Sequence, residues 1–174
     1  LGIERNPRWE DILQHLAPLP VEDGLYVSYE GIEGQWSEKN FEHPAITGIY
    51  GMLPGNGVDT AAVARTLEKV VGCWQWGDRI WGWDFPRMAM CAARCGMPEL
   101  ALDLLLHPCF KAQFDPHGYS KSWPIPYFPA NGGELAAIAM MCGGWDGCDT
   151  TADAPGFPRD GTWKVRHEGF RKMQ

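Results

Sequence analysis

Two segments of this 174-residue chain are apolar on nearly every side, and they limit its possible folds more than any other feature. The first, Phe85–Cys95, is interrupted only by Arg87 and Arg94, and the second is Leu135–Cys142. At helical spacing such a segment has no polar side to turn toward water, so other elements must cover it all around. The sequence therefore predicts buried helices enclosed by other helices.

The segments around them are typical of amphipathic helices. Asn6 followed by Pro7 predicts the start of an N-terminal helix, and Asp59 caps a helix that extends to Trp74. A helix is also expected from His43 to Leu53, and Pro98–Leu106 forms the hairpin partner of the first apolar segment. Amphipathic helices that alternate with apolar ones favour a ring of inner helices wrapped by outer helices. An irregular helical bundle fits the periodicity equally well.

The fold class is therefore mainly α, in one domain over residues 1–174, with short strands near the ends. Leu25–Tyr29 and Trp163–His167 are the expected strands. A chain of this length buries roughly 70% of its unfolded surface, enough for a substantial core. The long segment between His107 and Gly132 is expected to be a loop.

Composition excludes several classes of protein. Asp and Glu number 22 against 15 Lys and Arg, a net charge of −7, which disfavours a nucleic-acid partner because phosphates need a basic surface. No apolar run approaches the roughly 20 residues of a membrane span. Hydrophobic residues make up 45% of the chain, which excludes disorder.

The six cysteines do not indicate a metal, a cofactor or a disulfide framework. Cys91 and Cys95 are one helical turn apart, which would suit metal ligands, but further ligands at suitable spacing are not evident. We therefore expect them to pack in the core, with no metal and no cofactor. Cys142 and Cys148 flank a Gly-rich turn and could pair under oxidising conditions, so the compartment stays open.

Three loops with a shared composition precede the expected buried helices. They are residues 42–44, 81–84 and 126–134, and each combines aromatic residues, Pro or Gly with polar side chains. If the helices run parallel in an inner layer, the loops emerge at one end and line one concave site. Aromatic faces beside carboxylates and amides suit a sugar, whose C–H faces stack on rings and whose hydroxyls need donors and acceptors.

Each candidate residue also has a simpler interpretation. Asp84 could serve simply as the N-cap of its helix. Glu134 could simply be a carboxylate that the helix dipole favours in a first helical turn. Glu30 could be a solvated loop charge, and His43 could be a cap rather than a ligand contact. The candidate sugar contacts are His43, Trp81, Trp83, Trp123, Tyr127 and Asn131.

These stretches resemble a known family. Trp81–Leu105 is similar to the late barrel segment of bacterial six-hairpin glycoside hydrolases, and Pro126–Met141 and Pro155–Gly169 are similar to the segments that follow it. His43–Gly55 resembles the earlier His-containing helix. The order matches the C-terminal part of α-L-fucosidase-like and maltose-phosphorylase-like (α/α)6 enzymes.

The resemblance implies hydrolysis of a glycosidic bond by an acid and a base on opposite sides of the sugar. The fucosidase-like group has an Asp where this chain has Pro129–Ala130, and its acid lies in a region that this chain mostly lacks. Asp84 and Glu134 are therefore the first candidate carboxylates, and Glu30 is the third. The resemblance slightly favours a periplasmic or secreted protein over a cytoplasmic one.

Length affects how this resemblance is interpreted. Twelve helices of roughly 11 residues with short connections need about 190 residues, so the chain is expected to be the C-terminal half of a larger (α/α)6 domain. Such a half would expose apolar helix sides along an open edge, and we expect self-association or pairing with the missing half of the barrel. A non-catalytic carbohydrate-binding module is the main alternative, and a purely structural helical domain is a third.

Overall fold

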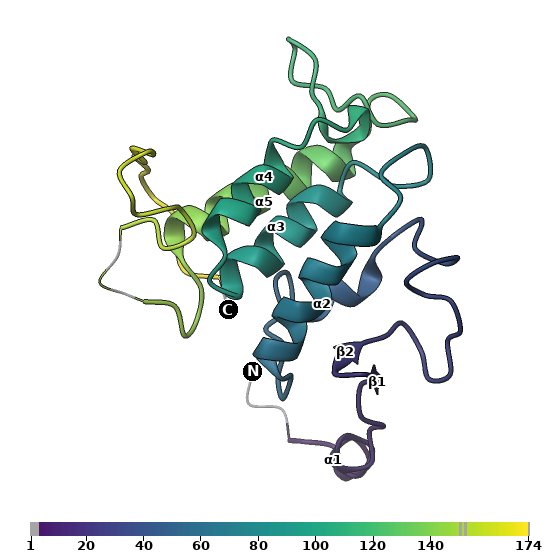
Figure 1. Ribbon diagram of the computed structural model, residues 1–174. Helices are drawn as coiled ribbons and strands as arrows, with labels where there is room; N and C mark the ends of the chain where they lie inside the picture. Colours follow the sequence, from purple (N-terminus) through teal and green to yellow (C-terminus); the bar gives the residue numbers. More distant parts are fainter. Residues whose placement is uncertain (1–3, 150, 152, 174) are drawn as a thin grey trace.

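The computed structural model describes residues 4–149, 151 and 153–173, and its regular structure is mainly helical, as predicted (Figure 1). The α-helices are α1 (Pro7–Gln14), α2 (Thr60–Cys73), α3 (Asp84–Arg94), α4 (Pro98–Leu105) and α5 (Phe128–Gly143). The 3-10 helices are η1 (Ala45–Ile49) and η2 (Phe110–Ala112). Strands β1 (Val21–Glu22) and β2 (Leu25–Tyr26) form one antiparallel pair. Among the described helices, none combines the length and the apolar character needed to traverse a bilayer.

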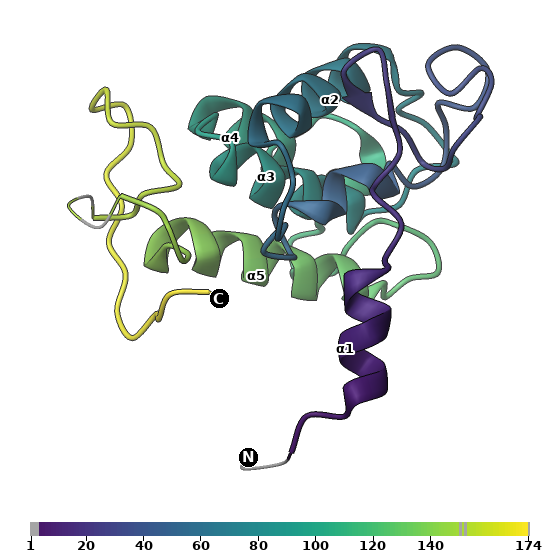
Figure 2. The same cartoon turned by 90° about the horizontal axis from the view of Figure 1, so that it is seen from below.

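Helix α3 is the centre of the helical body. Helices α2 and α4 lie beside it, and α5 runs along one side of this layer (Figures 1 and 2). All eleven residues of α3 are buried, including Arg87 and Arg94. The prediction of an apolar helix that is covered all around is confirmed here. Full burial of a side chain such as Phe85 or Met88 contributes roughly 1.5–3 kcal/mol to folding.

Helix α5 is apolar but covered on one side only. Ala130, Ala137 and Met141 are buried, whereas Phe128 and Leu135 are 61% and 70% exposed. The prediction of coverage all around is therefore wrong for this helix within the described part of the chain. Two large apolar side chains of α5 are therefore open to solvent.

Helix α1 is formed as predicted but lies outside the core. The side chain of Asn6 accepts a hydrogen bond from the Arg8 amide at 3.0 Å, and Pro7 takes the first helical position. None of its residues is buried, and Trp9 is 66% exposed. Figure 2 shows α1 projecting away from the other helices. Its apolar face is therefore a second uncovered surface.

The helix predicted from His43 to Leu53 is wrong in length, because only the five residues of η1 are helical. Tyr50 is extended, and Gly51 then lies directly against α3, where a Cβ would be 2.7 Å from the Cys91 amide nitrogen. The Gly51 carbonyl accepts a hydrogen bond from Arg94 Nε at 2.8 Å. This contact with α3 replaces the continuation of the helix.

Two other boundaries differ from the predictions. The loop after His107 ends earlier than expected, because α5 begins at Phe128 rather than near Leu135. The segment 163–167, predicted as a strand, is irregular, and the only pairing among the described residues near this terminus is a bridge between Trp145 and Met173. The expectation of strands near both ends is therefore confirmed only near the N-terminus.

Candidate functional site

Asp84 is the centre of a hydrogen-bonded cluster at the N-terminal end of α3. Its side chain is 0% exposed. It accepts hydrogen bonds from the Trp81 amide at 3.0 Å and from Arg87 Nη2 at 2.9 Å, and its oxygens lie 2.9 and 3.0 Å from His43 Nδ1. Burial raises the pKa of Asp84, while Arg87, the Trp81 amide and His43 act to lower it.

The alternative that Asp84 only caps α3 is wrong. Trp83 is in the N-cap position, and Asp84 is the first residue of α3. The Asp84 carboxylate accepts a hydrogen bond from the Trp81 amide, which lies before the helix begins. Arg87 lies one turn further along α3, three residues after Asp84, and forms a buried ion pair with it. The carboxylate therefore joins the His43 side chain, the Trp81 backbone amide and the Arg87 side chain of its own helix.

The loop that carries His43 is held in place by two contacts of Glu42. Glu42 has a φ of 62°, in the left-handed region that a residue other than glycine adopts at a cost of order 1 kcal/mol or more. Its carbonyl accepts a hydrogen bond from Trp74 Nε1 at 3.0 Å, and its carboxylate pairs with Arg79 at 3.1 Å. These contacts position the His43 ring against Asp84.

Two aromatic rings of the loop before α3 lie against the His43 ring. The His43 centroid lies 5.8 Å from Trp81, in a tilted arrangement, and 5.3 Å from Trp83, in an edge arrangement. The ring of Tyr127, at the start of α5, lies 5.2 Å from Trp81. Burial and the nearby charge of Asp84 raise the pKa of Tyr127. The structure therefore brings together five of the residues that the sequence singled out, which are His43, Trp81, Trp83, Asp84 and Tyr127.

Close backbone packing holds these segments together. A Cβ at Gly82 would be 2.7 Å from the Lys111 carbonyl oxygen and 2.9 Å from Ala130 Cβ. A Cβ at Gly133 would be 2.9 Å from Pro86 Cγ, so α5 packs tightly against α3 at a position where glycine leaves room. The loop before α3 is thus fixed directly against the start of α5.

Glu134 belongs to α5, although not to its first turn as the sequence predicted. Because α5 begins six residues earlier, at Phe128, Glu134 lies well inside the helix, between the buried positions Ala130 and Ala137. The side chain is half-buried, and this burial raises its pKa to about 7. A carboxyl group with this pKa is protonated in a substantial fraction of molecules at neutral pH.

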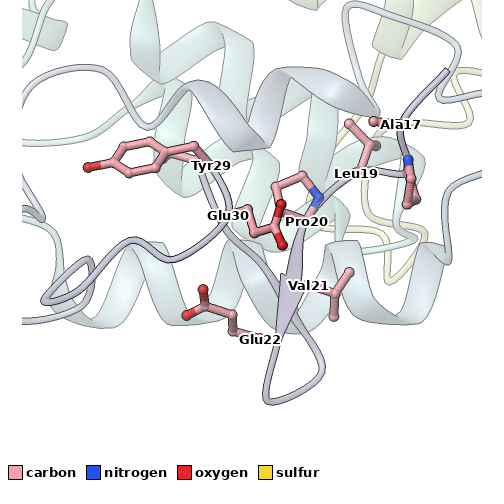
Figure 3. A pocket seen from close by; sticks show the side chains of 9 residues that line it. Ala17, Leu19, Pro20, Val21, Glu22, Tyr29 and Glu30 are labelled. Atoms are coloured by element: carbon pink, nitrogen blue, oxygen red, sulfur yellow. The ribbon is translucent and has the colours of Figure 1, made fainter.

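Trp123, Asn131 and Glu30 are placed apart from the ring cluster. Trp123 is 74% exposed, and Asn131 anchors the preceding loop by donating to the Gly118 carbonyl at 2.6 Å. Glu30 is exposed and lines a different pocket of about 540 Å3, beside Glu22 and Tyr29 (Figure 3). The described contacts do not join any of these three side chains to His43 or Asp84.

The sequence-based interpretation missed Arg87 as a site residue. It noted the arginine only as a break in an apolar segment. The signal was present, because an Asp and an Arg three residues apart on a helix are neighbours on its surface. Two buried donors of the site, Arg87 Nε and Trp83 Nε1, have no hydrogen-bond partner among the described residues.

A pocket of about 430 Å3 opens beside the cluster. It is lined by Glu42, His43, Asp78, Arg79 and Trp81. A second pocket of about 280 Å3 adjoins it, because both share the walls formed by Glu42 and His43. His43 is the member of the hydrogen-bonded cluster that lines both spaces, with 36% of its side chain exposed.

Within residues 4–149, 151 and 153–173, no group of three or more His, Cys, Asp or Glu side chains is arranged to hold a metal ion. All six cysteines are free thiols, including Cys142 and Cys148. Comparison of the chain with protein-family models, with curated proteins and with solved structures finds no match. The site is therefore interpreted from its own chemistry.

Proposed function

We propose that the cluster around His43 binds carbohydrate and forms part of the active site of a glycoside hydrolase. The observation that carries this proposal is the convergence of three loops, which brings Trp81 and Trp83 against the His43 ring beside a pocket and Tyr127 against Trp81. Ring faces can stack on a sugar, and the indole, phenol and imidazole groups can bond its hydroxyls.

Glu134 is our candidate for the general acid. A pKa near 7 suits proton transfer to a leaving-group oxygen at neutral pH, because the acid is still partly protonated and donates readily. Asp84, the other leading candidate, is fully buried and reaches the pocket only through His43. Glu30 is the third candidate, in its own pocket.

A ring of the (α/α)6 type is the architecture we propose for the complete site. It is supported by the full coverage of α3 and by the uncovered apolar sides of α5 and α1. Further helices, from a longer polypeptide or from a second copy, would cover these sides. Sedimentation tests this proposed architecture, because uncovered apolar surfaces of this kind promote association between polypeptides.

The proposal is tested by a screen of aryl glycosides and oligosaccharides. Sugar binding is followed by tryptophan fluorescence, and hydrolysis by release of reducing sugar. We expect Trp81→Ala to weaken binding about fivefold or more, because one lost stacking face removes about 1 kcal/mol or more. Trp9→Ala, on the exposed face of α1, is the matched control and should bind normally. Equal binding by both variants would contradict a sugar site at Trp81.

A non-catalytic carbohydrate-binding module is the second candidate. It is favoured by the burial of Asp84, whose oxygens already accept hydrogen bonds from three groups. Sugar binding without release of reducing sugar would support this alternative. If the chain is a hydrolase, Asp84→Asn should lower turnover by orders of magnitude, since general acid–base groups contribute about 10²–10⁴-fold. A purely structural domain predicts neither binding nor turnover.

A further inference from the structure

We propose that His43 is the proton acceptor of this site, through Nε2, and that Asp84 is the positioning residue that holds its ring in the required orientation. This inference rests on the proposed carbohydrate chemistry and assigns roles within the same site. It replaces direct carboxylate action by Asp84 with action through an imidazole.

The geometry at Nδ1 carries the first step. Both oxygens of Asp84 lie within 3.0 Å of His43 Nδ1, while the same carboxylate is held by Arg87 and by the Trp81 amide. These other contacts fix the carboxylate, so it cannot follow the ring if the ring turns. The ring is confined further by its contacts with Trp81 and Trp83. The imidazole is thus restricted to one orientation.

The ionised state of Asp84 carries the second step. Arg87 is protonated at all ordinary pH values, and its buried ion pair with Asp84 already brings the local charge to zero. An ionised carboxylate has no hydrogen to donate, so its oxygens can only accept. The bond at Nδ1 is therefore one in which His43 donates its Nδ1–H to Asp84.

The third step concerns the other ring nitrogen. A neutral imidazole has one donor and one acceptor nitrogen, so donation from Nδ1 leaves a lone pair on Nε2. Of the His43, Asp84 and Arg87 group, His43 is the residue that lines the pockets, whereas Asp84 and Arg87 are buried. The polar group that the cluster presents to a ligand is therefore an acceptor.

In a hydrolytic step this acceptor would activate water. The water oxygen forms a bond to the anomeric carbon while the glycosidic carbon–oxygen bond breaks. One water proton moves to His43 Nε2, and the leaving oxygen takes up a proton from the acid, for which Glu134 is our candidate. Asp84 stays ionised throughout and stabilises the imidazolium that forms.

The tautomer of His43 provides a direct test on the unmodified protein. Long-range proton–nitrogen correlation spectra of uniformly 15N-labelled protein show which ring nitrogen carries hydrogen. His43→Gln serves to assign the signals against the other four histidines. We expect the Nδ1–H tautomer at pH 8. An Nε2–H tautomer, or a ring protonated on both nitrogens, would overturn the inference.

Two matched variants test the chemical role. His43→Asn can keep a hydrogen-bond donor for Asp84 near the position of Nδ1 but places no atom at the position of Nε2. His43→Gln instead extends an amide to the position of Nε2. We expect His43→Asn to fold normally and to lose turnover by about 10²–10⁴-fold, with sugar affinity changed less than tenfold. Asp84→Asn should lower turnover as well and mix the His43 tautomers, which loss of a merely structural contact would not do.

The outcomes for the inference and for the proposed function are separable. Full turnover by His43→Asn would overturn the role of His43 even though a hydrolase had been found. Absence of sugar binding and turnover in the unmodified protein would overturn the proposed function. The spectra would then still show whether Asp84 holds the Nδ1–H tautomer.

Discussion

Helices α3 and α5 contain similar apolar residues but differ in their surroundings. Every residue of α3 is buried, even two arginines, whereas α5 exposes Phe128 and Leu135 along one side. The difference shows that an apolar segment predicts that its helix must be covered, but not which elements cover it. In α3 the charged residues are matched inside the fold, as Arg87 is by Asp84. In α5 the apolar side chains on one side stay in contact with solvent.

The strongest test of this contrast is Arg87→Ala. Removing the guanidinium leaves the Asp84 carboxylate buried without its partner, and such changes cost about 3–5 kcal/mol of unfolding free energy. Urea unfolding followed by tryptophan fluorescence measures the loss. Arg159→Ala, which breaks the exposed pair with Asp149, should cost less than about 1 kcal/mol. Similar losses in both variants would contradict a desolvated interior at α3.

Adjacent glycines of α5 give the next test. A Cβ at Gly133 would be 2.9 Å from Pro86 Cγ, whereas a Cβ at Gly132 would meet nothing within 4 Å. We expect Gly133→Ala to destabilise the protein by about 1–3 kcal/mol through overpacking. Gly132→Ala should stabilise it by about 0.5–1 kcal/mol, because alanine favours the helix. Thermal unfolding distinguishes the two signs, and the same sign in both would refute the close approach of α5 to α3.

Glu134 provides a pH-dependent test on the covered side of α5. Its pKa rises from 4.5 in the unfolded chain to about 7, so between these values the folded protein binds more protons and stability falls as pH rises. Above pH 7 the charged form costs about 1–2 kcal/mol, after allowance for solvent screening of a half-buried group. Glu134→Gln should remove this loss. If the unfolding free energies of the two proteins changed in parallel between pH 4.5 and 7, the raised pKa of Glu134 would be contradicted.

The smallest effect is expected on the open side of α5. Leu135→Gln should change the unfolding free energy by no more than about 0.5 kcal/mol in the monomer, because the side chain is largely exposed. Chemical denaturation at low protein concentration measures this. A loss of 2 kcal/mol or more would show that the position is covered in solution, which would remove the contrast with α3.

Several features of the fold could be predicted from the sequence because they depend on local patterns. The caps at Asn6 and Asp59 follow from short-range hydrogen bonding, and the burial of α3 follows from its apolar composition. The start of α5 could not be predicted, since Gly132 and Gly133 are typical of a loop. Contact with Pro86 compensates for their low helix propensity, and that contact is not visible in the sequence.

The residue types that form the candidate site could be predicted from the sequence, but the role of each residue within the site could not. The loops around His43, Asp84 and Tyr127 were identified because they share aromatic and polar residues. The contact of Asp84 with His43 depends on how the loop at His43 meets α3, which no short-range pattern encodes. The pairing of Asp84 with Arg87, by contrast, follows from their spacing on one helix. Trp123 and Asn131 share the composition of the site but not its location.

The close packing at Gly82 limits how this site can be redesigned or diversify. Its backbone lies against Lys111 of η2 and Ala130 of α5, so any side chain there would displace both elements at once. Trp81 and Trp83 on either side are only partly buried, so other rings can replace them with less disturbance of the fold. A mutational library over residues 81–83 should therefore recover variety at the outer positions and glycine alone in the middle.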